Sequence, residues 1–306
     1  MVGYGQVASM QEPAFNITTS SFIDIPATLL QSEPAGAANG TFLTVVCCLA
    51  AIAGWVIWRR RLTQVPRDAS GRLPQDALLG VVAMMLFYVA GALGALVIGE
   101  RMDPSDPYGR LARGALGNAA QVALAVALIR SPLFVDAERP PARPRDALAA
   151  GGIGFLLALP IVLALGAAIG LLMTALGFPP PPATSHETLR ILLEKGEAVF
   201  TLLTLAHVAL LVPIAEEAGW RGILQPSLRK AGLGGTGAAL ATAVLFAAIH
   251  WSVMPPDSRV AGLAMLVTLG FALGLLRERT GGILAPIVLH ALFNAWNVVL
   301  TLARSA

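Results

Sequence analysis

The chain has 306 residues, of which 56% are hydrophobic and only 13% are charged. Soluble globular domains carry about 25% charged residues, so this composition excludes a soluble enzyme and indicates a polytopic membrane protein. The formal net charge of +3 comes from arginines between the apolar segments, and we expect the lipid bilayer rather than nucleic acid as a partner.

Eight apolar segments, each of roughly the length that a bilayer requires, follow a polar N-terminal tail at residues 1–40. The segments are residues 41–58, 77–98, 114–129, 147–176, 197–220, 234–251, 260–276 and 282–303. The third is the least regular, because it contains Asn118 and Gln121. We expect an all-α membrane bundle of about eight transmembrane helices, with N-terminal helices in residues 41–195 and a second group in 196–303.

The basic residues predict the orientation. Fourteen of the 21 Lys and Arg residues fall in loops that follow odd-numbered segments, and cytoplasmic loops carry the excess of positive charge. We therefore expect an integral, multi-pass protein with both termini outside. Because the chain is rich in Ala, Gly and Arg, we expect a bacterial inner membrane. Cys47 and Cys48 are adjacent and rarely pair in such a position, so we predict that they pack within the bundle.

Two adjacent glutamates are the strongest clue to function. Glu216 and Glu217 follow a long apolar run, and a carboxylate at membrane depth costs about 2.5–3.5 kcal/mol on insertion scales. Glu217 and Arg221 lie four residues apart, so they share a helix face and can pair. Glu216 is rotated by about 100° from Glu217. We therefore expect one carboxylate to be neutralised structurally and the other to face a site.

Two histidines and an asparagine in later segments supply partners for Glu216. His250 follows Phe246 by four residues, and His290 precedes Asn294 by four, so each pair shares a helix face. Glu216 with His250 could hold a water molecule and remove its proton. His290 and Asn294 could donate hydrogen bonds to the oxyanion that forms on a cleaved carbonyl. Together, these residue types are the parts of a hydrolytic site.

Three motifs carry a resemblance to a known family. Residues 216–222, with the sequence EEAGWRG, resemble the EExxxR(G) motif of the CAAX-protease and bacteriocin-processing (CPBP, also called ABI) intramembrane proteases. Residues 246–250 match its FxxxH motif, and residues 290–294 match its HxxxN motif. The resemblance covers about residues 196–303. It implies a catalytic transmembrane core, similar to the Ras-converting CAAX proteases, that cleaves a membrane-bound or lipidated peptide, prenylated CAAX-type termini included.

The resemblance also implies a role for each matched residue. The implied catalytic residues are the base Glu216, its partner His250, and the oxyanion residues His290 and Asn294. The residues implied to support the site are Glu217, Arg221 and Phe246. The family has been called metalloprotease, yet a metal-free glutamate mechanism is the better supported. We expect no cofactor, because the chain has no H-E-x-x-H motif; zinc is the alternative, for which Glu216, His250 and His290 would form a sparse but possible ligand set.

A non-enzymatic membrane protein is the alternative interpretation. A bacteriocin-immunity factor, or a transporter coupled to protons or cations, could use the same buried polar residues. A transporter built from inverted repeats should carry matching broken helices in both halves, whereas the polar residues of this chain gather in one half. The sequence therefore favours the endopeptidase.

Overall fold

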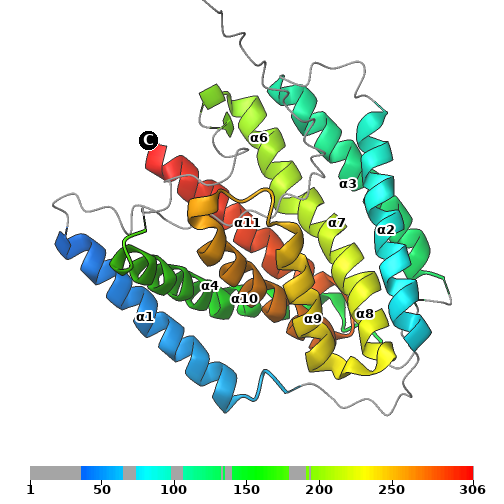
Figure 1. The fold of residues 1–306 in the computed structure, drawn as a ribbon, viewed down its shortest axis with the longest axis horizontal. Helices are drawn as coiled ribbons and strands as arrows, with labels where there is room; N and C mark the ends of the chain where they lie inside the picture. The colour runs from blue at the N-terminus through cyan, green and yellow to red at the C-terminus, as the bar shows by residue number, and fades with distance from the viewer. Residues whose placement is uncertain are drawn as a thin grey trace, which may run out of the picture.

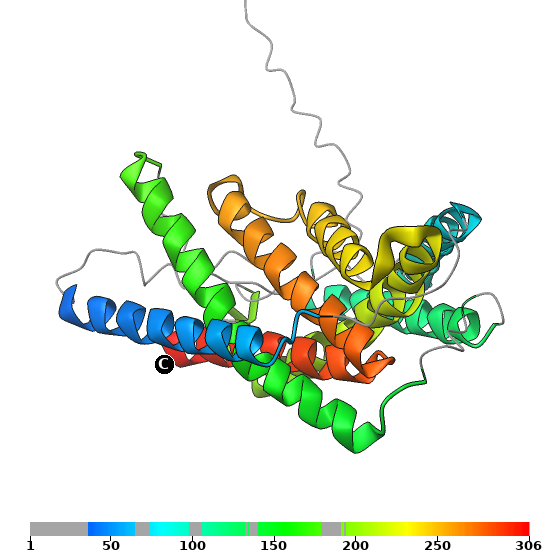
Figure 2. The same cartoon turned by 90° about the horizontal axis from the view of Figure 1, so that it is seen from below.

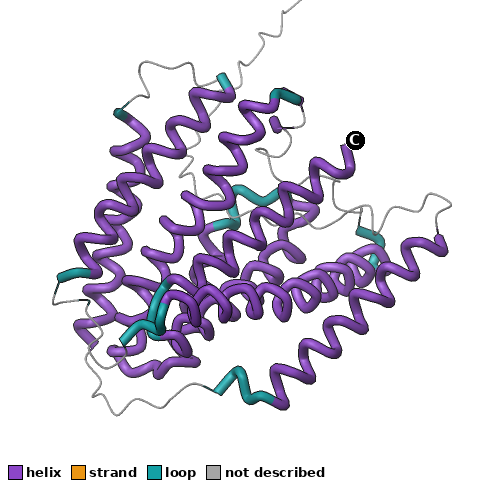
Figure 3. Tube along the Cα trace, turned by 180° about the vertical axis from the view of Figure 1, so that it is seen from behind, coloured by secondary structure: helices purple, strands orange, loops and turns teal. Residues whose placement is uncertain are grey.

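Every regular element in the described part of the protein is helical. The computed structural model describes residues 36–64, 74–97, 106–131, 134, 140–178, 191–192 and 194–305, and Figure 3 shows helices joined by loops in this part. Of the predicted tail at residues 1–40, residues 1–35 lie outside the described residues, and residues 36–40 already belong to the first helix. The all-α class predicted from composition is confirmed.

Each predicted apolar segment coincides largely with a helix. The elements in chain order are α1 (Gly36–Arg59), α2 (Pro74–Leu96), α3 (Pro107–Ile129), α4 (Pro144–Ala175), α6 (Ala198–Ala206), η2 (His207–Leu211), α7 (Val212–Gly219), η3 (Trp220–Leu224), α8 (Gln225–Leu228), η4 (Arg229–Leu233), α9 (Gly234–Ile249), α10 (Pro256–Thr280) and α11 (Leu284–Ser305). The elements labelled η are π-helical. Two predicted segments fall on one helical run, Ala198–Ile249, which is broken at Gly232 with a φ of 103°.

Prolines and glycines set several helix ends. Pro107, Pro144 and Pro256 lie in the first turns of α3, α4 and α10, where a missing N–H costs nothing because that group has no partner within the helix. α10 ends at Gly281, whose φ of 66° is left-handed. Local sequence therefore decides where these helices begin and end.

Two groups of helices flank the central run. On one side α4, a 32-residue helix, packs against α1, α10 and α11; on the other, α2 and α3 pack against each other and against α7 and η3. Figure 1 shows α1 on one side of the central run and α2 and α3 on the other, and Figure 2 shows α4 running obliquely across α1.

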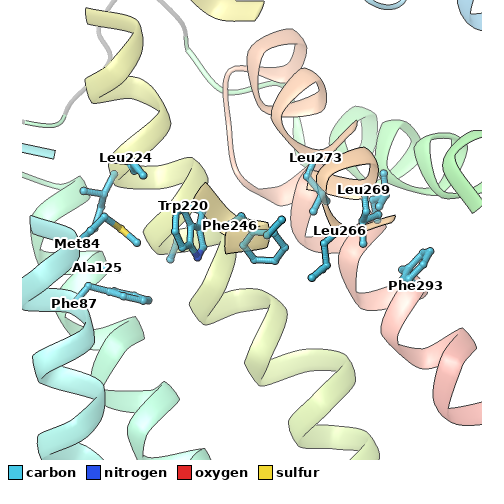
Figure 4. Packing of buried hydrophobic residues seen from close by; sticks show 14 of the residues in the cluster. Met84, Phe87, Ala125, Trp220, Leu224, Phe246, Leu266, Leu269, Leu273 and Phe293 are labelled. Carbon is cyan, nitrogen blue, oxygen red and sulfur yellow. The ribbon is translucent and has the colours of Figure 1, made fainter. Parts of the chain in front are cut away.

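A buried aromatic pair joins the two groups. The rings of Trp220 on η3 and Phe246 on α9 meet edge to face with centroids 5.6 Å apart. In Figure 4, Met84 and Phe87 of α2 lie on one side of this pair and Leu266 of α10 lies on the other. All five side chains are buried. The core therefore continues from the N-terminal helices, through the central run, to the C-terminal helices.

The outer surface is apolar and the interior holds polar groups. Trp58, Leu156 and Leu202 are among many large exposed hydrophobic residues. Six helices or helical runs in the described residues are long and apolar enough to cross a membrane, and α1 carries a shorter apolar stretch. Such a distribution suits hydrocarbon as the surrounding solvent. The chain is an integral, multi-pass membrane protein, as predicted, and the orientation of its termini stays a prediction.

The prediction for the two cysteines is wrong. Cys47 and Cys48 are unpaired thiols and are exposed on α1, so they do not pack within the bundle. The physical reason is that α1 packs mainly against α4, which covers only part of its circumference. An apolar run by itself does not reveal which side of a peripheral helix meets the bundle.

Candidate active site

The two glutamates lie on a short α-helix between two π-helical segments. α7 carries both residues, with η2 before it and η3 after it. A π-helical turn bonds residue i to residue i+5, and such turns are frequent at functional sites. Each added residue shifts the helical phase by about 100°. The faces along this run therefore do not follow one continuous α-helical period.

Pro213 leaves a backbone carbonyl for Asn294 to bind. Because the Val212 N–H bonds the His207 carbonyl, it is not available to the carbonyl of Val208. The i+5 partner of Val208 would be Pro213, which has no N–H. Asn294 on α11 donates from Nδ2 to the Val208 oxygen at 2.9 Å. One predicted site residue is thus fixed by a buried carbonyl that its own helix cannot satisfy.

Pro226 creates the same arrangement one segment later. The Gln225 N–H bonds the Trp220 carbonyl, and the i+5 partner of the Arg221 carbonyl would be Pro226. Arg277 on α10 donates from Nε to the Arg221 oxygen at 3.0 Å. Each proline therefore leaves one helix carbonyl without a backbone donor. These two carbonyls accept hydrogen bonds from side chains of α11 and α10.

Arg221 and Glu217 form the ion pair that their spacing predicts. Arg221 Nη1 donates to Glu217 Oε1 at 2.9 Å, and both side chains are completely buried. Arg221 Nη2 also donates to the Gly270 carbonyl at 3.0 Å. A Cβ at Gly270 would lie 3.4 Å from Nη2 and 3.2 Å from the Cα of Ala243. The absence of a side chain at this glycine lets α10 approach the guanidinium closely.

His290 lies between the two carboxylates. Its Nδ1 is 2.8 Å from Glu217 Oε1, and its Nε2 is 3.8 Å from Glu216 Oε2. Because an ionised carboxylate only accepts hydrogen bonds, Nδ1 carries a proton toward Glu217. The 3.8 Å separation on the other side is longer than a direct hydrogen bond. One imidazole therefore approaches both carboxylates, each with a different ring nitrogen.

The hydrogen bonding of His250 shows which of its ring nitrogens donates and which accepts. It caps the end of α9, and its Nδ1 lies 2.6 Å from the Phe246 carbonyl. A carbonyl only accepts, so Nδ1 is the donor, and in the neutral ring Nε2 carries the lone pair. Within the described residues Nε2 is buried and has no hydrogen-bond partner. A water or substrate group could meet His250 only through this acceptor.

The ring of Phe246 lies close to three of the polar side chains. Its centroid lies 4.9 Å from that of His250 and 6.2 Å from that of His290. The Arg221 guanidinium carbon lies 4.9 Å from the same ring, within the range of a cation–π contact. A single buried aromatic side chain from α9 thus contacts functional groups from η3 and α11.

The residues fit a metal ion poorly. Among the described residues there is no group of three or more His, Cys, Asp or Glu side chains arranged to hold a metal. Nδ1 of His250 bonds a carbonyl and Nδ1 of His290 bonds Glu217, so each ring offers only its Nε2 to any further ligand. The zinc set Glu216, His250 and His290 considered from sequence therefore lacks a metal-binding arrangement here.

A second polar group lies next to this cluster. His207 Nε2 is 2.9 Å from Asn118 Oδ1, and Asn118 Nδ2 donates to Gln121 Oε1 at 3.0 Å. The polar residues of the third segment therefore bond to each other and to η2. Sequence reasoning also overlooked Tyr88 and the Arg277 contact. No motif signals them, since their place at the site depends on helix packing.

Comparison with known proteins adds an independent finding. Residues 198–296, about a third of the chain, match the model of the family described as type II CAAX prenyl endopeptidase Rce1-like. The match begins with α6, includes all three motifs and ends two residues after Asn294. No curated protein and no solved structure matches the chain. Over these residues the chain is similar to the type II CAAX prenyl endopeptidases, which confirms the predicted resemblance to CPBP intramembrane proteases.

Proposed function

We propose that the protein is an intramembrane endopeptidase in which Glu216 activates a water molecule. The family match supports a protease of CAAX type, and such a protease acts on a membrane-associated protein. The substrate that we propose is a peptide held at the bilayer by a lipid, with a prenylated C-terminal cysteine as the first class to test. The lipid would bring the scissile bond to the depth of the buried polar cluster.

The main support for the proposal is the hydrogen bonding of His250. Its Nδ1–H donates to the Phe246 carbonyl, which leaves Nε2 as a buried acceptor beside the ring that also contacts His290. An imidazole nitrogen that carries a lone pair is suited to accept a hydrogen from water. A purely structural histidine would gain more by bonding through both nitrogens.

Charge balance in the cluster supports the hydrogen-bonding role that we propose for His290. Glu216 and Glu217 carry two negative charges and Arg221 carries one positive charge, so protonated His290 makes the set neutral. Neutrality matters here because an uncompensated buried charge is strongly unfavourable. The proton on His290 Nε2, directed toward Glu216, is therefore part of the resting state that we propose.

The proposed reaction keeps its protons balanced. Glu216 accepts one proton from the water as the water oxygen bonds to the peptide carbonyl carbon, and His250 Nε2 orients the same water by accepting its other hydrogen in a hydrogen bond. His290 and the second Nδ2 hydrogen of Asn294 donate hydrogen bonds to the oxyanion. When the carbon–nitrogen bond breaks, the proton taken from water passes to the leaving amine. Glu217 and Arg221 take no part in proton transfer and hold His290 in place.

The test is cleavage of defined peptides by the purified protein in lipid nanodiscs. A farnesylated CAAX-type peptide and its unprenylated counterpart are compared for wild type, Glu216→Gln and His250→Gln. Removing a general base should lower kcat by about 100-fold or more. Glu197→Gln is the matched control, since this exposed glutamate lies outside the cluster, and it should cleave as wild type does.

Adding a metal chelator provides a second test. Cleavage by the wild type should continue in its presence, because the proposed base needs no metal. Equal cleavage by wild type and Glu216→Gln would refute the assignment of the base. Absence of cleavage for both peptides would instead favour the non-enzymatic interpretation.

A further inference from the structure

The π-helical turn η2 is bonded from two sides by other helices. His207 is the first residue of this turn, and its Nε2 lies 2.9 Å from Asn118 Oδ1 on α3. The next residue, Val208, accepts a hydrogen bond from Asn294 of α11 through its backbone carbonyl. Adjacent residues of one turn are therefore attached to α3 and to the helix that carries His290 and Asn294.

Three residues of α3, Gly114, Asn118 and Gln121, form a socket for the His207 ring. A Cβ at Gly114 would lie 3.0 Å from His207 Cε1, so the missing side chain lets the ring lie against α3. The ring also hydrogen-bonds the Gly114 backbone. Asn118 and Gln121 are buried, and Asn118 Nδ2 donates to Gln121 Oε1 at 3.0 Å. Because this bond leaves Oδ1 to face His207, Asn118 accepts and His207 Nε2 carries the proton.

The hydrogen-bond register of η2 decides whether Asn294 has an acceptor. In the structure the Val212 N–H bonds the His207 carbonyl. In a continuous α-helix the same N–H would bond the Val208 carbonyl, and His207 would rotate by about 100° relative to α7 and leave its socket. The Val208 carbonyl would then be occupied and Asn294 would lose its acceptor. The contact of His207 with Asn118 and the bond of Asn294 therefore require the same register.

The socket belongs to a part of the chain that no motif covers. Its three residues lie outside residues 198–296, which match the family model. Polar side chains inside an apolar segment are costly unless they are paired and are commonly functional. Turns of π-helix are rare, so contacts from outside the helical run are expected to hold this one. The first half of the chain supplies such a contact.

We propose that His207, held by Asn118, is a positioning residue that fixes the π-helical register of η2 and so leaves the Val208 carbonyl free to orient Asn294. This inference rests on the function proposed above, in which the second Nδ2 hydrogen of Asn294 stabilises the oxyanion. His207 acts through Asn294 and does not touch the substrate. Its loss should therefore lower kcat and leave peptide affinity unchanged.

The kinetic experiment compares His207→Ala with His207→Gln in the nanodisc assay. Alanine removes the donor to Asn118, whereas glutamine places an amide N–H near the position of imidazole Nε2. His207→Ala should lower kcat by about tenfold, because misplacing a group that acts in the transition state slows the reaction. The Kd of the uncleaved peptide, measured in the Glu216→Gln background, should stay within about twofold. His207→Gln should recover most of the lost kcat.

Thr204→Val is the matched control. Thr204 is buried on the same helical run, one turn before Val208, and within the described residues its hydroxyl makes no hydrogen bond. This variant removes a polar atom of the run without removing a contact to α3, so it should cleave as wild type does. Thermal unfolding of each variant shows whether a change in rate arises from lost structure.

A substitution on α3 tests the same contact from its other side. Asn118→Ala removes the acceptor and keeps His207, so it should give the same loss of about tenfold in kcat. The double variant with His207→Ala should lose no more than either single variant, because both remove one interaction. If His207→Ala does not fold, Asn118→Ala decides.

Nuclear magnetic resonance of the histidine rings gives a readout that needs no turnover. The chain has four histidines, so isotopically labelled histidine yields few signals, and the signal of His290 is the one lost in His290→Gln. His290 donates to Glu217 and lies one turn before Asn294 on α11. Its signal should shift in His207→Ala and keep its wild-type position in His207→Gln and Thr204→Val.

The outcomes separate this inference from the function on which it rests. An unchanged kcat and an unchanged His290 signal in His207→Ala, with Glu216→Gln inactive, would overturn the positioning role and leave the protease standing. A raised Kd with unchanged kcat would also overturn it, since His207 would then bind substrate, and so would a loss of kcat that glutamine does not restore. Conversely, a protein that cleaves neither peptide, but whose His290 signal shifts in His207→Ala alone, would retain the effect of His207 on the cluster and refute the protease.

Discussion

Replacing Arg221 with methionine removes one partner of a completely buried ion pair. Arg221 donates to Glu217 at 2.9 Å and to the Gly270 carbonyl at 3.0 Å, and its guanidinium lies against Phe246. Methionine retains much of the volume but supplies no donor. Glu217 would keep only its contact with His290, and the Gly270 carbonyl would lose its side-chain donor. The variant therefore leaves a buried carboxylate that is poorly compensated.

The expected loss in the free energy of unfolding follows from the burial of the ion pair. Breaking a buried pair by removing one partner costs about 3–5 kcal/mol. The remaining His290 contact compensates part of the charge, so we expect the lower end, about 3 kcal/mol. The double variant Arg221→Met with Glu217→Gln removes both charges and should recover most of this loss, because exchanging a whole buried pair is often nearly neutral.

The assay is reversible unfolding in mixed detergent micelles, followed by far-ultraviolet circular dichroism. Lys195→Met is the matched control, because Lys195 pairs with Glu197 at a similar 3.0 Å while the two side chains are 29% and 50% exposed. Because this exposed pair is screened by solvent, the control should lose much less stability than Arg221→Met. A loss below about 1 kcal/mol in Arg221→Met, or a double variant less stable than the single one, would refute the argument from burial.

Three further predictions test other parts of the structure. Asn294→Leu leaves the buried Val208 carbonyl unbonded and should lower the free energy of unfolding by about 1–3 kcal/mol in the same assay; no loss would mean that this carbonyl finds another donor. Gly94→Val should reduce the yield of folded protein, because a Cβ at this glycine would lie 2.7 Å from a backbone oxygen of α3; normal folding would show that α2 and α3 can separate there. Hydrogen bonds from the Tyr108 hydroxyl and a lysine lower the pKa of Glu197 below its ordinary value of 4.5. The stabilisation is therefore present above pH 4.5 and lost as pH falls through the lowered value, so Glu197→Gln should remove this part of the acid sensitivity of unfolding; an unchanged pH dependence would contradict this.

The sequence alone determined the all-α membrane class and the position of most helices. Apolar runs and basic loops are local properties, and a bilayer imposes one length on every helix that crosses it. Spacing also predicted the contact between Glu217 and Arg221, because residues four apart in a helix are neighbours whatever surrounds them. The three motifs likewise indicated which polar residues lie in one region.

Only the tertiary structure decided how those residues meet. The π-helical segments shift the helical phase, so no single period predicts which faces align along Ala198–Ile249. The contact of Asn294 with Val208, and the approach of Tyr88 to Trp220, join helices far apart in sequence. Such contacts depend on the distance and rotation between packed helices, which are set by many side chains together. A sequence pattern describes one helix at a time and cannot contain them.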